Sequence, residues 1–159
     1  MRETKLLVSP LRYPGGKTRA RGVLSGLMLP GVNHVLSPFF GGGSFEVLLA
    51  QTGFRVTGFD GFPLLAAFWE SVMDDPDRLA GQVGSYVGDV DATRFKGLQK
   101  RLERFQGKQV PKSERDRVAE WFYVVNRCSF SGVTMAGGFS KASADTRFTR
   151  SAVDRLRLF

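Results

Sequence analysis

The feature that most constrains this chain is a pair of short strand-like runs, each followed by a helix-like segment. The first run, residues 34–39, leads into three glycines and then a helix-compatible segment from Ser44 to Gln51. The second run, residues 54–59, ends at Asp60, and apolar residues then recur at steps of three and four. Because strands that alternate with helices are joined by crossovers, this order predicts an α/β fold with a parallel, doubly wound sheet.

The glycines after the first run are suited to holding a ligand. Glycine adopts positive φ at low cost, and its lack of a side chain lets backbone N–H groups approach a bound molecule. Asp60 follows Gly43 by 17 residues, and a carboxylate at a strand end can accept both hydroxyls of a ribose. The dinucleotide fingerprint has a third glycine where this chain has Glu46, so an adenosine-containing ligand is favoured over nicotinamide. The alternative is a tight turn and a helix-capping aspartate.

Charge is distributed unevenly along the chain. The 159 residues have a net charge of +8. Residues 1–93 carry 8 basic and 9 acidic side chains, a balance of −1, whereas residues 94–159 carry 15 and 6, a balance of +9. One-sided charge predicts an anionic partner, and nucleic acid fits best because phosphates supply many such contacts. A basic but merely solvated surface is the alternative.

Several protein classes are excluded by composition. The single cysteine, Cys128, cannot form an internal disulfide, and no apolar run approaches the roughly 20 residues that cross a bilayer. We therefore expect no membrane partner and a reducing cytoplasm. His34 is the only histidine and has no cysteine or histidine partner, so we predict no metal site and no Ser–His–Asp triad. Cys128 is interpreted as a small buried hydrophobe.

Two further motifs each allow two interpretations. The run from Gly15 to Thr18 resembles the end of a phosphate-binding loop, but the glycine required five positions before Gly16 is Leu11. A nucleotide-binding phosphotransferase that uses Lys17 is therefore the weakest hypothesis, and a turn with a solvated lysine is the plain alternative. Residues 126–132 offer an amide, a guanidinium, hydroxyls and an aromatic ring, which are suited to reading DNA, and the alternative is a simple helix cap. They lead into a predicted loop or hairpin over residues 129–140.

Four ordered segments together resemble the DNA adenine N6-methyltransferase family of the Dam-like or D12 class. These segments are Arg12–Lys17, Pro38–Ser44, Phe59–Trp69 and Phe122–Thr149. The resemblance implies a Rossmann-like, S-adenosylmethionine-dependent methyltransferase sheet, incomplete here, with a mainly helical, basic subdomain that binds double-stranded DNA. It implies that S-adenosylmethionine is bound by Tyr13, Gly16, Lys17, Phe39, Gly41, Gly43 and Asp60. The residues expected to contact DNA are Arg101, Arg104, Asn126, Arg127, Ser129, Phe130, Ser131 and Arg147.

The resemblance also implies a division of labour along the chain. Residues 1–91 would bind the cofactor, residues 92–150 would recognise the DNA target, and residues 151–159 would return to the methyltransferase domain. The expected setting is DNA methylation, as in restriction–modification, in the cytoplasm of a bacterial or phage-infected cell.

Two departures from the family pattern matter. Ser37 stands where the family usually has an acidic residue before the Pro-Phe pair. The Asp-Pro-Pro-Tyr motif, whose Asp and Pro carbonyl accept the amino hydrogens of adenine while the Tyr stacks on the base, does not occur in the 159 residues. We therefore expect no catalytic residue in this chain and a complementing C-terminal subunit or segment that carries the motif. The alternative is a catalytically inactive, methyltransferase-like module that binds DNA or regulates.

Overall fold

The structure is a computed structural model that describes residues 7–159. Its contacts form two compact units. The N-terminal unit comprises residues 7–9 and Gly15–Asp60, and the C-terminal unit comprises Pro10–Pro14 and Gly61–Phe159. The predicted limits at residues 91 and 150 concern which residues bind cofactor and which bind DNA, and they stay a prediction.

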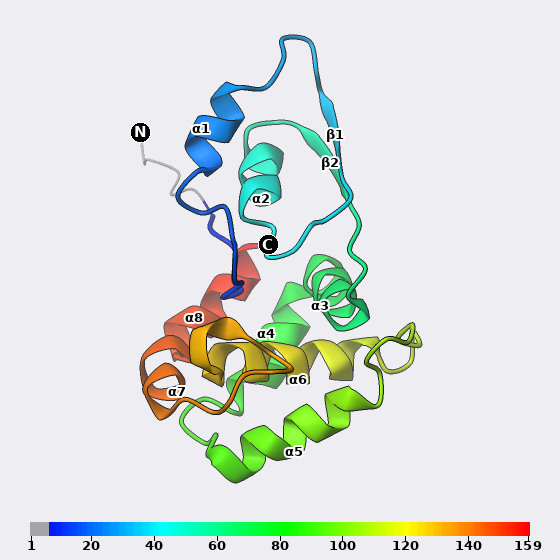
Figure 1. The fold of residues 1–159 in the computed structure, drawn as a ribbon. Helices are drawn as coiled ribbons and strands as arrows, with labels where there is room; N and C mark the ends of the chain where they lie inside the picture. The colour runs from blue at the N-terminus through cyan, green and yellow to red at the C-terminus, as the bar shows by residue number, and fades with distance from the viewer. Residues whose placement is uncertain (1–6) are drawn as a thin grey trace. The chain divides into compact units, whose positions relative to one another are not determined.

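The N-terminal unit has a small parallel sheet with one helix packed against it and a second helix packed on the first (Figure 1). Its elements in chain order are α1 (Arg21–Gly26), β1 (His34–Ser37), α2 (Ser44–Gln51) and β2 (Arg55–Gly58). β1 and β2 pair in parallel, with His34 opposite Arg55 and Ser37 opposite Gly58. The predicted strand, helix and parallel pairing are confirmed. Within residues 7–159 the sheet has these two strands alone, so the fold is a mixture of helices and a small parallel sheet.

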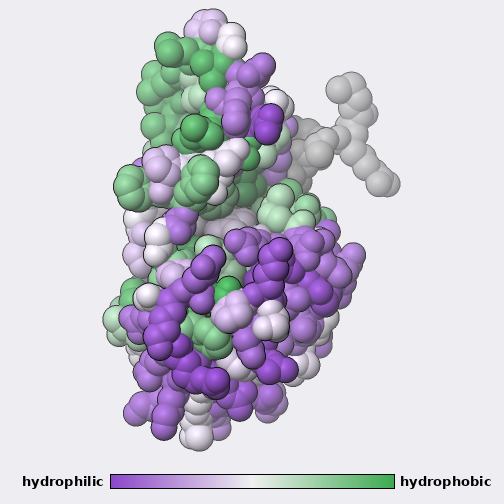
Figure 2. Space-filling model, turned by 90° about the vertical axis from the view of Figure 1, so that its right-hand side faces the viewer, coloured by the Kyte–Doolittle hydropathy of each residue, from purple (hydrophilic) through white to green (hydrophobic). Residues whose placement is uncertain are grey.

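Apolar surface remains exposed on much of the N-terminal unit. Its buried hydrophobic side chains lie mainly on α2, at Val47, Leu48 and Leu49. Figure 2 shows hydrophobic colour over much of the unit that contains β1 and β2, and largely hydrophilic colour over the C-terminal unit. The exposed large hydrophobic residues of the N-terminal unit are Val8, Val23, Leu27, Leu29, Val32, Leu36, Phe39 and Phe59.

The C-terminal unit is helical. Its elements are α3 (Pro63–Asp74), α4 (Pro76–Gly84), α5 (Ala92–Glu103), α6 (Arg115–Cys128), η1 (Phe130–Gly132), α7 (Lys141–Arg147), α8 (Arg150–Asp154) and η2 (Arg155–Leu158). α6 packs against both α3 and α5 (Figure 1). In the described part of the chain, no helix combines the length and the apolar character needed to span a bilayer.

Local sequence explains where these helices begin. Asp75 caps α4 by accepting a hydrogen bond from the backbone N–H of Arg78 at 2.9 Å, and Pro76 occupies the first helical position. α6 begins at Arg115, directly after a turn. In this turn the N–H of Glu114 donates to the carbonyl of Pro111.

Aromatic side chains fill the core of the C-terminal unit. The ring of Phe68 on α3 stacks on Tyr123 of α6 with a centroid separation of 5.7 Å and an interplanar angle of 5°. Phe122 also packs against Phe68, with centroids 6.0 Å apart. The Tyr123 hydroxyl donates to the carbonyl oxygen of Ala152 at 3.0 Å, and burial raises the pKa of Tyr123 to about 12. The core therefore joins α3, α6 and α8 through one continuous set of contacts.

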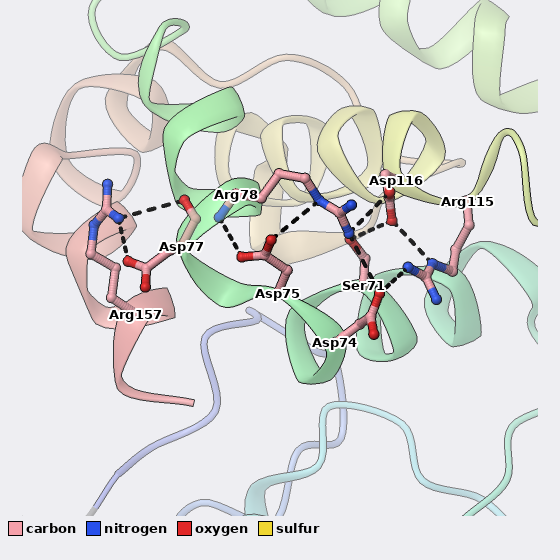
Figure 3. Close-up of polar contacts among 8 residues, drawn as sticks. All are labelled: Ser71, Asp74, Asp75, Asp77, Arg78, Arg115, Asp116 and Arg157. Atoms are coloured by element: carbon pink, nitrogen blue, oxygen red, sulfur yellow. Dashed lines mark hydrogen bonds and ion pairs between the residues drawn. The ribbon is translucent and has the colours of Figure 1, made fainter.

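A network of ion pairs fastens the start of α6 to the junction of α3 and α4 (Figure 3). Arg115 reaches Asp74 at 2.6 Å and Asp116 at 3.0 Å. Arg78 pairs with Asp116 at 3.0 Å, and the hydroxyl of Ser71 donates to Asp116 at 3.1 Å. The hydrogen bond from Arg115 is the main reason that the pKa of Asp74 is lowered.

Candidate functional site

The glycine loop and Asp60 meet in the N-terminal unit. The backbone N–H of Gly41 donates to Oδ2 of Asp60 at 2.8 Å. Gly41 and Gly43 have φ values of 55° and 64°, a left-handed conformation that side-chain-bearing residues rarely adopt. Because β1 and β2 are parallel, the loop and Asp60 both lie at the carboxyl ends of the strands. This edge is where open α/β sheets bind ligands.

Contacts around the loop bring its neighbours together. The hydroxyl of Ser37, the last residue of β1, donates to Oε1 of Glu46 at 2.8 Å. The hydroxyls of Thr18 and Ser44 lie 3.0 Å apart, so the Gly15–Thr18 turn is joined to the first residue of α2. Two sequence motifs that are separated by more than twenty residues therefore adjoin each other within this unit.

The remaining predicted cofactor residues are Tyr13, Gly16, Lys17 and Phe39. Phe39 is 87% exposed. Gly16 and Lys17 are exposed, and Nζ of Lys17 lies 3.5 Å from the carbonyl oxygen of Gly15. Tyr13 belongs to the C-terminal unit. The geometry of the described residues thus brings Gly41 and Asp60 into contact, with Gly43 in the same loop, and the cofactor roles of all seven residues stay predictions.

Asn126, which was expected to contact DNA, is fully buried near the end of α6. Its Oδ1 accepts a hydrogen bond from the backbone N–H of Arg12 at 3.0 Å, and its Nδ2 donates to the carbonyl of Arg12 at 2.8 Å and to that of Gly132 at 3.0 Å. A Cβ on Gly132 would lie 2.1 Å from the Arg12 carbonyl oxygen, so only glycine permits this approach. The amide therefore holds the Pro10–Pro14 segment against the residues after α6.

Arg127 is also buried, and it makes internal contacts to carbonyl oxygens. Its guanidinium donates to the carbonyl oxygen of Arg147, and its Nη1 lies 3.3 Å from the carbonyl oxygen of Pro10. Burial is the largest cause that lowers the pKa of Arg127. Ser129, another predicted DNA contact, is fully buried as well. These three side chains make structural contacts inside the C-terminal unit, and a role for them in DNA contact stays a prediction.

Residues 129–139 form a constrained loop, as expected for this glycine- and serine-rich stretch. Ser129 and Phe139 make an isolated antiparallel bridge, and the N–H of Phe130 donates to the carbonyl of Gly138 at 3.0 Å. At the tip, Phe130 is 70% exposed and Ser131 has a φ of 54°, which is unusual for a residue with a side chain. The loop thus presents an aromatic ring and a hydroxyl from a bridged base.

Two loop-holding residues were missed by the sequence reasoning. Nε2 of Gln99 on α5 donates to the carbonyls of Thr134 and Gly137, both at 2.8 Å. The Arg12 guanidinium donates to the carbonyl of Ser129 at 3.0 Å and to the hydroxyl of Ser143 at 2.9 Å. The local sequence does not reveal these contacts, because the partners lie more than thirty positions away.

The basic face of α5 is exposed. Arg101 and Arg104 are both exposed, and the guanidinium of Arg101 lies 5.3 Å from the ring centroid of Trp121. Arg147, at the end of α7, is exposed too. A shallow hollow on this face is lined by Gly97, Lys100, Arg101, Glu103 and Arg104.

Carboxylates of the C-terminal unit are engaged in structural contacts. Asp74 and Asp116 take part in the ion pairs of Figure 3, Asp75 caps α4, and Asp77 pairs with Arg157 at 2.5 Å. Cys128 is buried, and burial raises the pKa of its thiol to about 12. This burial agrees with the interpretation of Cys128 as a small buried hydrophobe.

Comparison with protein families agrees with this geometry. A parallel strand pair with a glycine loop and a strand-end carboxylate is typical of α/β proteins that bind nucleotides. The family model of D12 class N6 adenine-specific DNA methyltransferases matches residues 13–150, and the chain belongs to this family. Such enzymes generally use S-adenosylmethionine, and their substrate is DNA. A search of curated proteins gives no match.

Proposed function

We propose that this chain supplies the cofactor-binding and DNA-binding parts of a site-specific DNA adenine N6-methyltransferase. The observation that carries the proposal is the contact between the Gly41 N–H and the Asp60 carboxylate at the carboxyl ends of β1 and β2. It joins the two motifs that the family pattern assigns to the cofactor, and the chain's family membership gives that contact its meaning.

The residues at this edge fit S-adenosylmethionine. The carboxylate of Asp60 is a suitable acceptor for ribose hydroxyls, and the left-handed glycines leave room for the methionine part. When bound, the cofactor supplies an activated methyl group on sulfur. The role of this chain is to hold that molecule by its ribose and methionine parts at the edge of the sheet.

Calorimetry with S-adenosylmethionine tests the cofactor proposal. Asp60→Ala should weaken binding by about 1.5–3 kcal/mol, the usual scale for hydrogen bonds to a charged group. Asp145→Ala removes an exposed carboxylate that pairs with Lys141, and it should leave affinity unchanged. Unchanged affinity in a folded Asp60→Ala variant would remove Asp60 from the site.

We further propose that the basic half contacts DNA in two ways. Arg101 of α5 and Arg104, the residue after this helix, are exposed and suit phosphates. The tip of the 129–139 loop, with exposed Phe130 and Ser131, suits base edges. The balance of +9 in residues 94–159 favours a salt-sensitive interaction with the duplex.

Binding of labelled duplexes at several salt concentrations separates these roles. Arg101→Ala and Arg104→Ala should each weaken binding to all sequences about equally and reduce the salt slope by about 1. Phe130→Ala or Ser131→Ala should instead change the preference among sequences. Arg55→Ala, which removes an exposed arginine of β2, is the matched control. A salt-independent affinity of the unaltered chain would contradict phosphate contact.

Catalysis, on this proposal, requires a segment or subunit that carries Asp-Pro-Pro-Tyr. The 159 residues lack the motif, and the Asp side chains near the start of α4 are engaged in capping and ion pairs. The same absence supports the second candidate, an inactive module that binds DNA. A neighbouring coding sequence with Asp-Pro-Pro-Tyr would favour the split enzyme acting on bacterial or phage DNA, and its absence would favour the module.

A further inference from the structure

A carboxylate from α2 reaches the residue that precedes the glycine loop. Ser37 ends β1 and is buried, and its hydroxyl donates to Oε1 of Glu46 at 2.8 Å. Glu46 lies in the first turn of α2, directly after the left-handed Gly43 that caps the helix. This hydrogen bond thus joins the residue before the Pro38–Gly43 loop to the helix that follows it. The carboxylate of Glu46 lies beside the two ends of the loop.

The carboxylate of Glu46 matters because the backbone groups around it favour anions, whereas a carboxylate favours cations. The start of α2 and the backbone N–H groups of the loop favour anions. The methionine part of S-adenosylmethionine carries a carboxylate, which suits those groups, but also an ammonium and a sulfonium. A cation held against this loop needs an anionic partner. The second carboxylate oxygen of Glu46 provides an acceptor beyond the one that Ser37 engages.

We propose that Glu46 is a cofactor-binding residue whose carboxylate binds the ammonium group of S-adenosylmethionine. Ser37 occupies the position where the family usually has an acidic side chain, and Glu46 contacts that very serine. Glu46, in the first turn of the helix, thereby places a carboxylate next to the position where the family usually has one. This inference rests on the proposed cofactor function, and it adds a residue that the motif pattern does not contain.

One substitution separates charge from structure. Gln in place of Glu46 still offers an oxygen to accept the Ser37 hydroxyl, but it carries no charge. Glu46→Gln should therefore fold normally and bind S-adenosylmethionine at least about tenfold more weakly, the low end for a hydrogen bond to a charged group. Glu70→Gln, which neutralises an exposed carboxylate of α3, is the matched control and should change nothing.

Three ligands locate the effect on the cofactor. By calorimetry, Glu46→Gln should lose affinity for S-adenosylmethionine and S-adenosylhomocysteine, which both carry the ammonium group. It should retain affinity for 5′-methylthioadenosine, which lacks the amino-acid part. Asp60→Ala, by contrast, should weaken all three, because each has the ribose.

A double variant tests whether a carboxylate at position 37 can replace the carboxylate of Glu46. Ser37→Asp combined with Glu46→Gln restores one carboxylate at the contact and should recover most of the lost affinity. Equal affinities of Glu46→Gln and the unaltered chain, an equal loss for 5′-methylthioadenosine, or no recovery in the double variant would each overturn the inference. If the unaltered chain bound none of the three ligands, the proposed cofactor function itself would fail.

Discussion

The two units of this chain differ in how completely each is packed. The C-terminal unit encloses a set of stacked aromatic rings around Phe68 and Tyr123 and is fastened by a charge network. The N-terminal unit has two strands and a core centred on α2, and it leaves large side chains such as Leu36 and Phe39 exposed. Parallel strands are normally buried on both faces. The difference is that the C-terminal unit encloses most of its large apolar side chains, whereas the N-terminal unit leaves several of its own exposed.

The first test removes the central ring of the better-packed unit. Phe68→Ala should lower the free energy of unfolding by about 3–5 kcal/mol, because it leaves a cavity among rings that cannot fully collapse. Leu36→Ala, at a side chain that is 64% exposed on β1, should change it by less than about 0.5 kcal/mol. Urea unfolding measures both. Similar costs at the two positions would break the comparison.

The second test concerns the buried amide that holds the Pro10–Pro14 segment. Asn126→Ala leaves the N–H and carbonyl of Arg12 without their partner and should destabilise the C-terminal unit by about 2–3 kcal/mol. Hydrogen exchange at the Arg12 amide should become faster. If hydrogen exchange at Arg12 is unchanged while DNA binding falls, Asn126 contacts DNA, and the structural role that we assign to it is wrong.

The third test uses pH. The pKa of Tyr123 is raised by burial from about 10 to about 12, so the folded state favours the neutral hydroxyl. Its contribution to stability is therefore complete below pH 10 and is lost as pH rises from about 10 to about 12. Tyr123→Phe should cost about 1 kcal/mol at neutral pH, through the lost bond to Ala152, and should reduce this alkaline dependence.

Tyr86 provides the internal reference for that experiment. Its pKa is also raised to about 12, mainly by burial and then by its hydrogen bond to Glu120. Some alkaline dependence should therefore persist in Tyr123→Phe. An unaltered slope in that variant would show that Tyr123 ionises as easily in the folded state as in the unfolded one.

The smallest expected effect is at Gln99. Gln99→Met removes the two hydrogen bonds to the loop and should cost about 0.5–1 kcal/mol. Amide exchange at Phe130 and Gly137 should accelerate while the core of α3 is unaffected. Gln106→Met, at an exposed position after α5, is the control. Unchanged loop exchange would mean that the bridge between Ser129 and Phe139 holds the loop alone.

The sequence predicted what depends on local pattern. The first strand was predicted over residues 34–39 and forms over His34–Ser37, and the helix Ser44–Gln51 forms as predicted, because turn glycines and apolar spacing are local signals. Family motifs pointed to Gly41 and Asp60, which the structure brings together.

What was missed depends on contacts between distant residues. Asn126 carries an amide suited to DNA, yet its partners are the backbone of a segment 114 positions earlier. Gln99 sits on a basic helix and gives no local hint that it holds a loop. The contact between Ser37 and Glu46 depends on how α2 packs beside the end of β1, which the sequence pattern does not show. The sequence pattern indicates which chemical groups are present. Tertiary packing decides which of these polar groups remain available to a ligand.

Methyl transfer by the purified chain tests the central claim most directly, namely that these residues hold cofactor and DNA but lack the groups that accept the amino hydrogens of adenine. With S-adenosylmethionine labelled in its methyl group and duplex DNA in excess, the chain alone should incorporate no label into DNA. Adding a polypeptide that carries Asp-Pro-Pro-Tyr should restore incorporation. Incorporation by the 159 residues alone, abolished by Asp60→Ala, would contradict the account and require an unrecognised catalytic group within them.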